Sequence, residues 1–229
     1  MVEMHLLSVS DSFVHDPIYA LGIVTTYDTF MEGYRPEEDI DKLFTALCLA
    51  VESTPEQYRN DAQSALSAAE GISLDDLKST LDQLDAAGAE GLSGMLKGVA
   101  ERDRFKYSRA FGIGFYTLAQ KIAPDLAEDK EQMMGFMKEA AESLSISFDK
   151  LQKDIELYRS NLEKMGQAKA LMAEVLEAER KKREERAQAK LAKDQPEEKP
   201  AEGEATTEGE ATPPVPTPAV EGEEPTDQS

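Results

Sequence analysis

The sequence predicts an all-α protein: a helical bundle, a long projecting C-terminal coiled-coil-like helix and a disordered acidic tail. Apolar residues recur three or four positions apart from residue 1 to about residue 178, which is the spacing of amphipathic helices. Capping residues followed by proline mark several helix starts. No stretch alternates polar and apolar residues for long enough to form a strand. We therefore expect at least six helices and no sheet.

The apolar pattern and the charge divide the 229 residues into three parts. We expect a helical bundle at 1–146, a long helix at 147–193 whose first half packs on the bundle and whose second half projects, and a disordered tail at 194–229. The tail is rich in Pro, Glu and Thr, holds 11 acidic residues and one lysine, and has too little apolar surface to offset the entropy of ordering. The net charge of −21 disfavours nucleic-acid binding.

The first nine residues, MVEMHLLSV, have the pattern of the interior of an amphipathic helix without a capping residue before them. We therefore expect further sequence upstream of Met1. No segment approaches the roughly 18 apolar residues that a membrane span requires, and no secretory signal opens the chain.

A tight helical hairpin is predicted near the N-terminus. Asp16 and Pro17 form a cap and first position, and this helix runs to a stop at Gly33. A second helix is expected to begin at Pro36, with three acidic residues at 37–39 in its first turn. These carboxylates suit the positive end of a helix dipole better than a metal site, because adjacent helical residues point in different directions.

Further caps and glycines organise the middle of the chain. Thr54 precedes a proline at the start of an Ala-rich helix, and Ser73 with Asp76 resembles a capping box. The stretch Ala86–Gly98 has four glycines, so we expect a loop with a broken turn there. It lacks the Gly-Lys-Ser/Thr ending of a phosphate-binding loop.

The next helices are predicted to be buried. Gly112-Ile113-Gly114 lies between aromatic residues within the helical pattern 103–122, so these glycines should let two helices approach closely. The methionines of the following helix, at 133, 134 and 137, should fill the core or a contact face, and Cys48 in the run ALCLA should be a small core residue.

The long helix is predicted to begin after Ser147 and to carry a heptad seam. Its members are Leu151, Ile155, Tyr158, Leu162, Met165, Met172 and Leu176. The segment 178–193 has no apolar stripe, which leaves two interpretations: a solvated single helix, or a docking surface for a partner or for anionic headgroups. The candidate partner-contact residues are Arg180, Lys181, Lys182, Arg183 and Arg186.

The sequence indicates a binding or assembly protein rather than an enzyme. His5, His15 and Cys48 do not provide the spacing of a zinc site, and no nucleophile-elbow motif is present. We therefore predict no catalytic, cofactor-binding or metal-ligating residues. Asp28 lies at the edge of an apolar arc and should pair with another group, for which we name Arg109 and Arg159 as candidates.

Three segments closely resemble the thylakoid formation protein family, also called the photosystem II biogenesis family. They are DPIYALGIVTTYDTFMEGY (16–34), KYSRAFGIGFY (106–116) and DIELYRSNLEKMGQAKALM (154–172). The resemblance extends from about Met1 to Arg183 and excludes the acidic tail. Family members begin with a further helical segment that bears a TRPI…YRR motif, which is absent here.

The resemblance implies a non-enzymatic adaptor or stabilising factor in thylakoid biogenesis and photosystem II assembly or repair, without a cofactor. It also implies contact with FtsH-type membrane proteases or other thylakoid membrane proteins, and a peripheral location on the cytoplasmic or stromal side of the thylakoid membrane. The alternative is a protein that binds pigment or another small molecule in its aromatic and Met-lined interior. A void among Tyr27, Phe30, Phe111 and Phe115 would favour this alternative, whereas a fully packed core would favour the adaptor.

Overall fold

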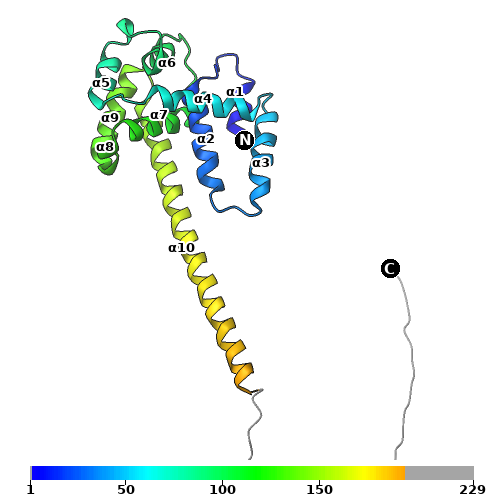
Figure 1. Ribbon diagram of the computed structural model, residues 1–229. Helices are drawn as coiled ribbons and strands as arrows, with labels where there is room; N and C mark the ends of the chain where they lie inside the picture. Colours follow the sequence, from blue (N-terminus) through cyan, green and yellow to red (C-terminus); the bar gives the residue numbers. More distant parts are fainter. Residues whose placement is uncertain (1, 194–229) are drawn as a thin grey trace, which may run out of the picture. The chain divides into compact units, whose positions relative to one another are not determined.

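The computed structural model describes residues 2–193, which form ten α-helices and two short 3-10 helices (Figure 1). No strand occurs within this range, so the all-α prediction is confirmed. The chain divides into two compact units, residues 1–173 and 174–229, which are described separately. The predicted disorder of the tail concerns residues outside the described range.

The first unit holds nine complete helices and the beginning of a tenth. In chain order they are α1 (Val2–Ser8), α2 (Pro17–Met31), α3 (Ile40–Leu49), α4 (Pro55–Ala68), α5 (Leu74–Asp82), α6 (Gly91–Ala100), α7 (Arg109–Ile122), α8 (Pro124–Glu128), α9 (Lys130–Ser143) and α10 (Phe148–Lys193). The 3-10 helices η1 (Glu37–Asp39) and η2 (Leu84–Ala86) precede α3 and α6.

Helix α2 is central to this unit because it packs against both α7 and α4. Its backbone meets that of α7 at Gly22 and Gly114: a Cβ added to Gly114 would lie 1.9 Å from the carbonyl oxygen of Ile18. Such a contact is possible only without side chains at the crossing. The predicted close approach of two helices is thus confirmed at Gly114, while Gly112 instead makes room for the side chains of Tyr107 and Leu151.

The predicted helix caps are confirmed. The Asp16 carboxylate accepts from the backbone N–H of Tyr19 at 2.9 Å, and the Thr54 hydroxyl accepts from that of Gln57 at 3.2 Å. Ser73 and Asp76 form a complete capping box at the start of α5. These bonds satisfy backbone donors that have no partner within the first turn of a helix.

Two apolar clusters form the core. The larger cluster joins α2 and α4–α10 and contains Phe111, Phe115, Met133 and Met137, all almost fully buried. The smaller cluster joins α1–α4 and α7, and it contains Cys48, which is 0% exposed. Burial raises the pKa of the Cys48 thiol to about 11, so this residue is a core residue, as predicted, and not a reactive thiol.

Two expectations about local structure are wrong. Pro36 precedes the helical segment instead of occupying its first position: the segment opens with the 3-10 helix η1 at Glu37, and the α-helix starts only at Ile40. The glycine-rich stretch expected to form a loop contains α6, which begins at Gly91 and buries Leu92 and Leu96. Burial of these leucines outweighs the helix propensity that the glycines forfeit.

Helix α10 continues across the boundary of the two units. Within the first unit, Leu151, Ile155 and Tyr158 of the seam are buried, whereas Met172 is 69% exposed. The described part of the second unit is Glu174–Lys193, which is helical throughout. Leu176, the last residue of the predicted seam, is exposed.

Candidate functional site

The first candidate site is an open cavity of about 350 Å³ in the first unit. Helices α1, α2, α3, α7 and the first part of α10 form its walls. Most of the lining is apolar: Met4, Leu7, Tyr19, Ile23, Tyr27, Phe30, Met31, Leu47, Ala110, Ile113, Leu157 and Tyr158. Phe30 and Leu157 remain 40% and 43% exposed, so the cavity presents apolar surface to solvent.

Of the four aromatic residues whose surroundings distinguish the two functions, only two line this cavity. Tyr27 and Phe30 line it, but Phe111 and Phe115 are each 1% exposed and stack on one another in the larger core cluster. Met4 of α1 and Leu157 of α10 line the cavity instead. The sequence carries no signal for these two residues, because their proximity depends on how distant helices pack.

Four polar residues give the cavity a distinct chemistry. They are Glu3, Thr26, Arg109 and Asn161. The Glu3 carboxylate accepts from the backbone N–H of Arg109 at 2.8 Å, which places an acid at the N-terminus of α7. The Thr26 hydroxyl is buried and has no hydrogen-bond partner among the described residues. A ligand that offers an acceptor or donor to Thr26 would therefore satisfy a polar atom that the fold leaves unpaired.

A polar network lies beside this cavity. Asp154 of α10 accepts from Arg109 Nε at 2.8 Å and from the Tyr107 hydroxyl at 3.1 Å. Burial, and next the negative charge of Asp154, raise the pKa of Tyr107, so its hydroxyl stays protonated as a donor. The network holds the start of α7 against α10.

The expected partners of Asp28 are wrong. Asp28 pairs with Arg59 of α4, whose two terminal nitrogens lie 3.2 and 3.3 Å from its carboxylate oxygens. The same guanidinium lies over the Phe44 ring, 4.8 Å from its centroid. Arg109 is bound to Asp154 instead, and Arg159 has a buried Nη1 with no partner among the described residues.

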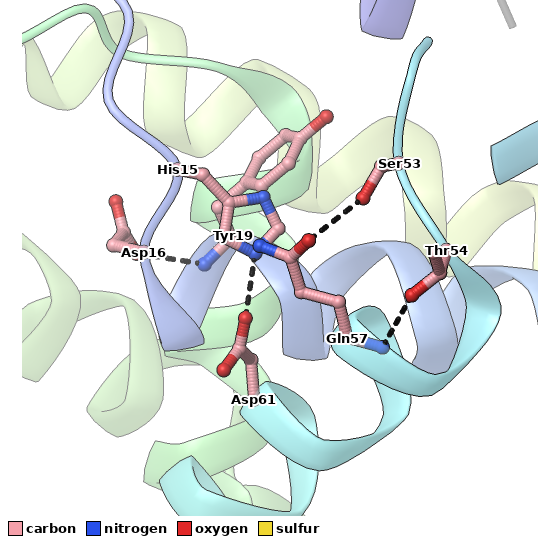
Figure 2. Close-up of polar contacts among 7 residues, drawn as sticks. All are labelled: His15, Asp16, Tyr19, Ser53, Thr54, Gln57 and Asp61. Carbon is pink, nitrogen blue, oxygen red and sulfur yellow. Dashed lines mark hydrogen bonds and ion pairs between the residues drawn. The ribbon is translucent and has the colours of Figure 1, made fainter. Parts of the chain in front are cut away.

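His15 belongs to a polar contact between the segment before α2 and helix α4. His15 Nε2 lies 2.9 Å from Asp61 Oδ2, while the Ser53 hydroxyl donates to the Gln57 side chain rather than to His15 (Figure 2). A histidine–aspartate pair needs an adjacent nucleophile to perform acyl transfer. Here the pair connects the turn before α2 to α4, next to the cap formed by Asp16 (Figure 2).

The second candidate site is the basic segment of α10. The predicted contact residues Arg180, Lys181, Lys182, Arg183 and Arg186 are all exposed. Two of them form pairs within the helix, Arg180 with Glu184 and Lys181 with Glu177, each at 3.3 Å. Exposed pairs of this kind contribute little stability and exchange readily, so the cationic groups remain available to a partner.

Two features are absent from residues 2–193, whose structure is described. No helix among them is both long and apolar enough to cross a membrane. They also contain no cluster of three or more His, Cys, Asp or Glu side chains arranged to hold a metal ion.

Comparison with known proteins decides the family. The sequence pattern described as "Thylakoid formation protein" matches residues 1–187. This chain belongs to the thylakoid formation protein family. Protein Thf1 of Nostoc sp. is 49% identical over 189 residues, which cover 82% of this chain and 81% of that protein. Protein Thf1 of Synechocystis sp. is 43% identical over 187 residues, which cover 82% and 78% of the two chains.

A solved structure supports the fold of this thylakoid formation protein. The structure described as Psb29 superposes with a TM-score of 0.67 at 38% sequence identity. The match covers 80% of this chain and 84% of Psb29.

Proposed function

We propose that this protein is a non-enzymatic adaptor or stabilising factor in thylakoid biogenesis and in photosystem II assembly or repair. It acts by protein–protein contact with an FtsH-type membrane protease, as a peripheral protein at the cytoplasmic or stromal face of the thylakoid membrane. Membership of the thylakoid formation protein family supports the process. The observation that supports the mechanism is the exposed basic segment of α10.

The basic segment has a composition suited to an anionic partner surface. Residues 178–193 hold seven basic and three acidic residues in a chain whose net charge is −21. The described side chains of this segment are exposed, so packing against other described residues does not account for them. Contact through these charges should weaken as salt is added, because exposed charges are screened.

Charge reversal of the segment tests this proposal. The variant replaces Arg180, Lys181, Lys182, Arg183 and Arg186 with glutamate, and affinity purification from thylakoid membranes measures the recovered protease. The control exchanges each arginine for lysine and each lysine for arginine, which keeps the charge. We expect the reversal, and not the control, to lower recovery, and far-UV circular dichroism to show both variants folded. Undiminished recovery of the protease by the reversed variant would reject the segment as the contact.

A second candidate function is the binding of a pigment or another apolar small molecule. The cavity of about 350 Å³, with its apolar walls and the unpaired Thr26 hydroxyl, favours it. Ligand sites commonly combine apolar walls with a few polar groups at this size.

Two variants at Thr26 separate the contributions of space and hydrogen bonding. Thr26→Phe places a ring in the cavity, whereas Thr26→Val keeps the volume and removes only the hydroxyl. Absorbance titration with chlorophyll a in detergent micelles should show binding to the wild type, weaker binding to Thr26→Val and none to Thr26→Phe. Equal affinity of all three proteins for chlorophyll a would exclude the cavity as the pigment site.

A further inference from the structure

A second cavity of the first unit, about 330 Å³ in volume, lies between α2, α7, α8 and the first part of α10. Its lining is Thr25, Tyr116, Thr117, Gln120, Ala127, Tyr158, Arg159 and Leu162. No carboxylate belongs to this lining, whereas one cationic residue, Arg159, does. Tyr158 also lines the apolar cavity and therefore lies between the two.

Arg159 differs from the other basic residues in the described part of the chain because one of its nitrogens is buried without a hydrogen-bond partner. The ion pairs of its neighbours in the fold, such as Arg109 with Asp154 and Lys169 with Glu32, do not include Arg159. The buried nitrogen is Nη1, which has no hydrogen-bond acceptor among the described residues. A guanidinium stays charged in a protein and carries five N–H donors, so burying one of its nitrogens without an acceptor is costly.

The neighbouring groups are suited to an anion. Gln120 provides an amide N–H₂ group, and Thr25 and Tyr116 provide hydroxyl donors, on helices that face Arg159. The Thr117 hydroxyl donates to the carbonyl of Ile113 at 2.9 Å and is therefore engaged within α7. The volume matches that of sites for small molecules.

We propose that Arg159 and this cavity form a binding site for an oxyanion, namely the phosphate or carboxylate group of a small molecule or of a lipid headgroup. Arg159 supplies the charge and a planar pair of donors, which match the two oxygens of such a group. Gln120 and Thr25 supply further hydrogen bonds. The site is separate from the basic segment of α10 and does not depend on the proposed protease contact.

An NMR titration of the full chain with inorganic phosphate at constant ionic strength tests the site. We expect saturable shifts that are concentrated at Thr25, Gln120 and Arg159. Arg159→Gln should abolish the shifts, and Arg159→Lys should weaken binding about tenfold or more, because a charge-assisted bond is lost while the charge remains. Arg104→Gln is the matched control, since it removes the same charge at an exposed position outside both proposed binding surfaces, and it should leave the titration unchanged.

Flotation with vesicles distinguishes the source of the oxyanion. If vesicles of phosphatidylglycerol retain the wild type better than Arg159→Gln, while phosphatidylcholine vesicles retain neither, the site takes a lipid headgroup. If the wild type and Arg159→Gln bind vesicles equally but only the wild type shows the phosphate shifts, the site takes a soluble anion. The proposal is overturned if neither binding depends on Arg159, or if wild-type phosphate shifts are linear and spread over the surface. If Arg159→Gln does not fold, the positions of the shifts in the wild-type phosphate titration decide between these outcomes.

Discussion

Gly22 of α2 and Gly114 of α7 lie in backbone contact at the centre of the first unit. A Cβ on Gly22 would be 1.7 Å from the carbonyl oxygen of Ala110 and 2.9 Å from the backbone nitrogen of Gly114. Because the obstacles are backbone atoms, no rotamer change relieves the overlap. Helices α2 and α7, which line both cavities, are therefore positioned by this crossing.

Alanine at either glycine should force α2 and α7 apart. We expect Gly22→Ala and Gly114→Ala each to lower the free energy of unfolding by about 3 kcal/mol or more, the upper range for overpacking. Gly135→Ala in α9 is the control, because a Cβ there meets nothing within 4 Å, and it should raise stability by about 0.5–1 kcal/mol. Urea unfolding measures all three variants. Equal stability of Gly114→Ala and the wild type would contradict the crossing.

Asp154 should couple the start of α7 to α10 through Tyr107. The hydrogen bond between the Tyr107 hydroxyl and the Asp154 carboxylate is 3.1 Å long. Tyr107→Phe removes the donor, and we expect it to cost about 1 kcal/mol of unfolding free energy. Asp154→Ala should cost more, because it also releases Arg109 and leaves the Tyr107 hydroxyl without its acceptor.

A double-mutant cycle of Tyr107→Phe and Asp154→Ala isolates this bond. The double variant should be more stable than the sum of the two single effects implies, by about 0.5 kcal/mol or more. Strict additivity would show that the two side chains do not interact in solution.

Features that depend on neighbouring residues in the chain were predictable from the sequence. The caps at Asp16, Thr54 and Ser73 are bonds to a backbone three residues away, so a capping residue at a helix start determines them. At Gly114 only the local part was predictable: a glycine between aromatic residues of a buried helix indicated a close approach, but not that the partner is α2.

Features that depend on distant helices were not predictable. Asp28 pairs with Arg59, 31 residues away, because α2 packs against α4, and no local pattern specifies that choice among the arginines. Likewise α6 forms in a glycine-rich stretch because Leu96 is completely buried by helices elsewhere in the chain. The cavities could not be predicted for the same reason, since residues of at least four helices line each of them.

Two capping aspartates should respond to pH with opposite signs. Burial raises the pKa of Asp16 above its ordinary value of 3.8, despite the backbone bond to Tyr19 and the ion pair with Arg102. The hydrogen bonds from the Ser73 side chain and backbone lower the pKa of Asp76 below the same ordinary value. A raised pKa means that the folded state binds the proton more tightly, and a lowered pKa means the reverse.

The contribution of Asp16 to the free energy of unfolding is fully present below pH 3.8 and is lost as the pH rises through the raised pKa. Asp16→Asn keeps a capping oxygen but does not titrate. The free energy of unfolding of this variant should therefore increase relative to that of the wild type as the pH rises from 3 to 7. The contribution of Asp76 to the free energy of unfolding is present above pH 3.8 and is lost as the pH falls through the lowered pKa. The free energy of unfolding of Asp76→Asn should therefore decrease relative to that of the wild type as the pH rises from 3 to 7. Differences in urea midpoint between each variant and the wild type, measured at pH 3, 5 and 7, cancel the titration of all other groups. If the difference in urea midpoint changed with pH in the same direction for both variants, burial would not dominate the pKa of Asp16.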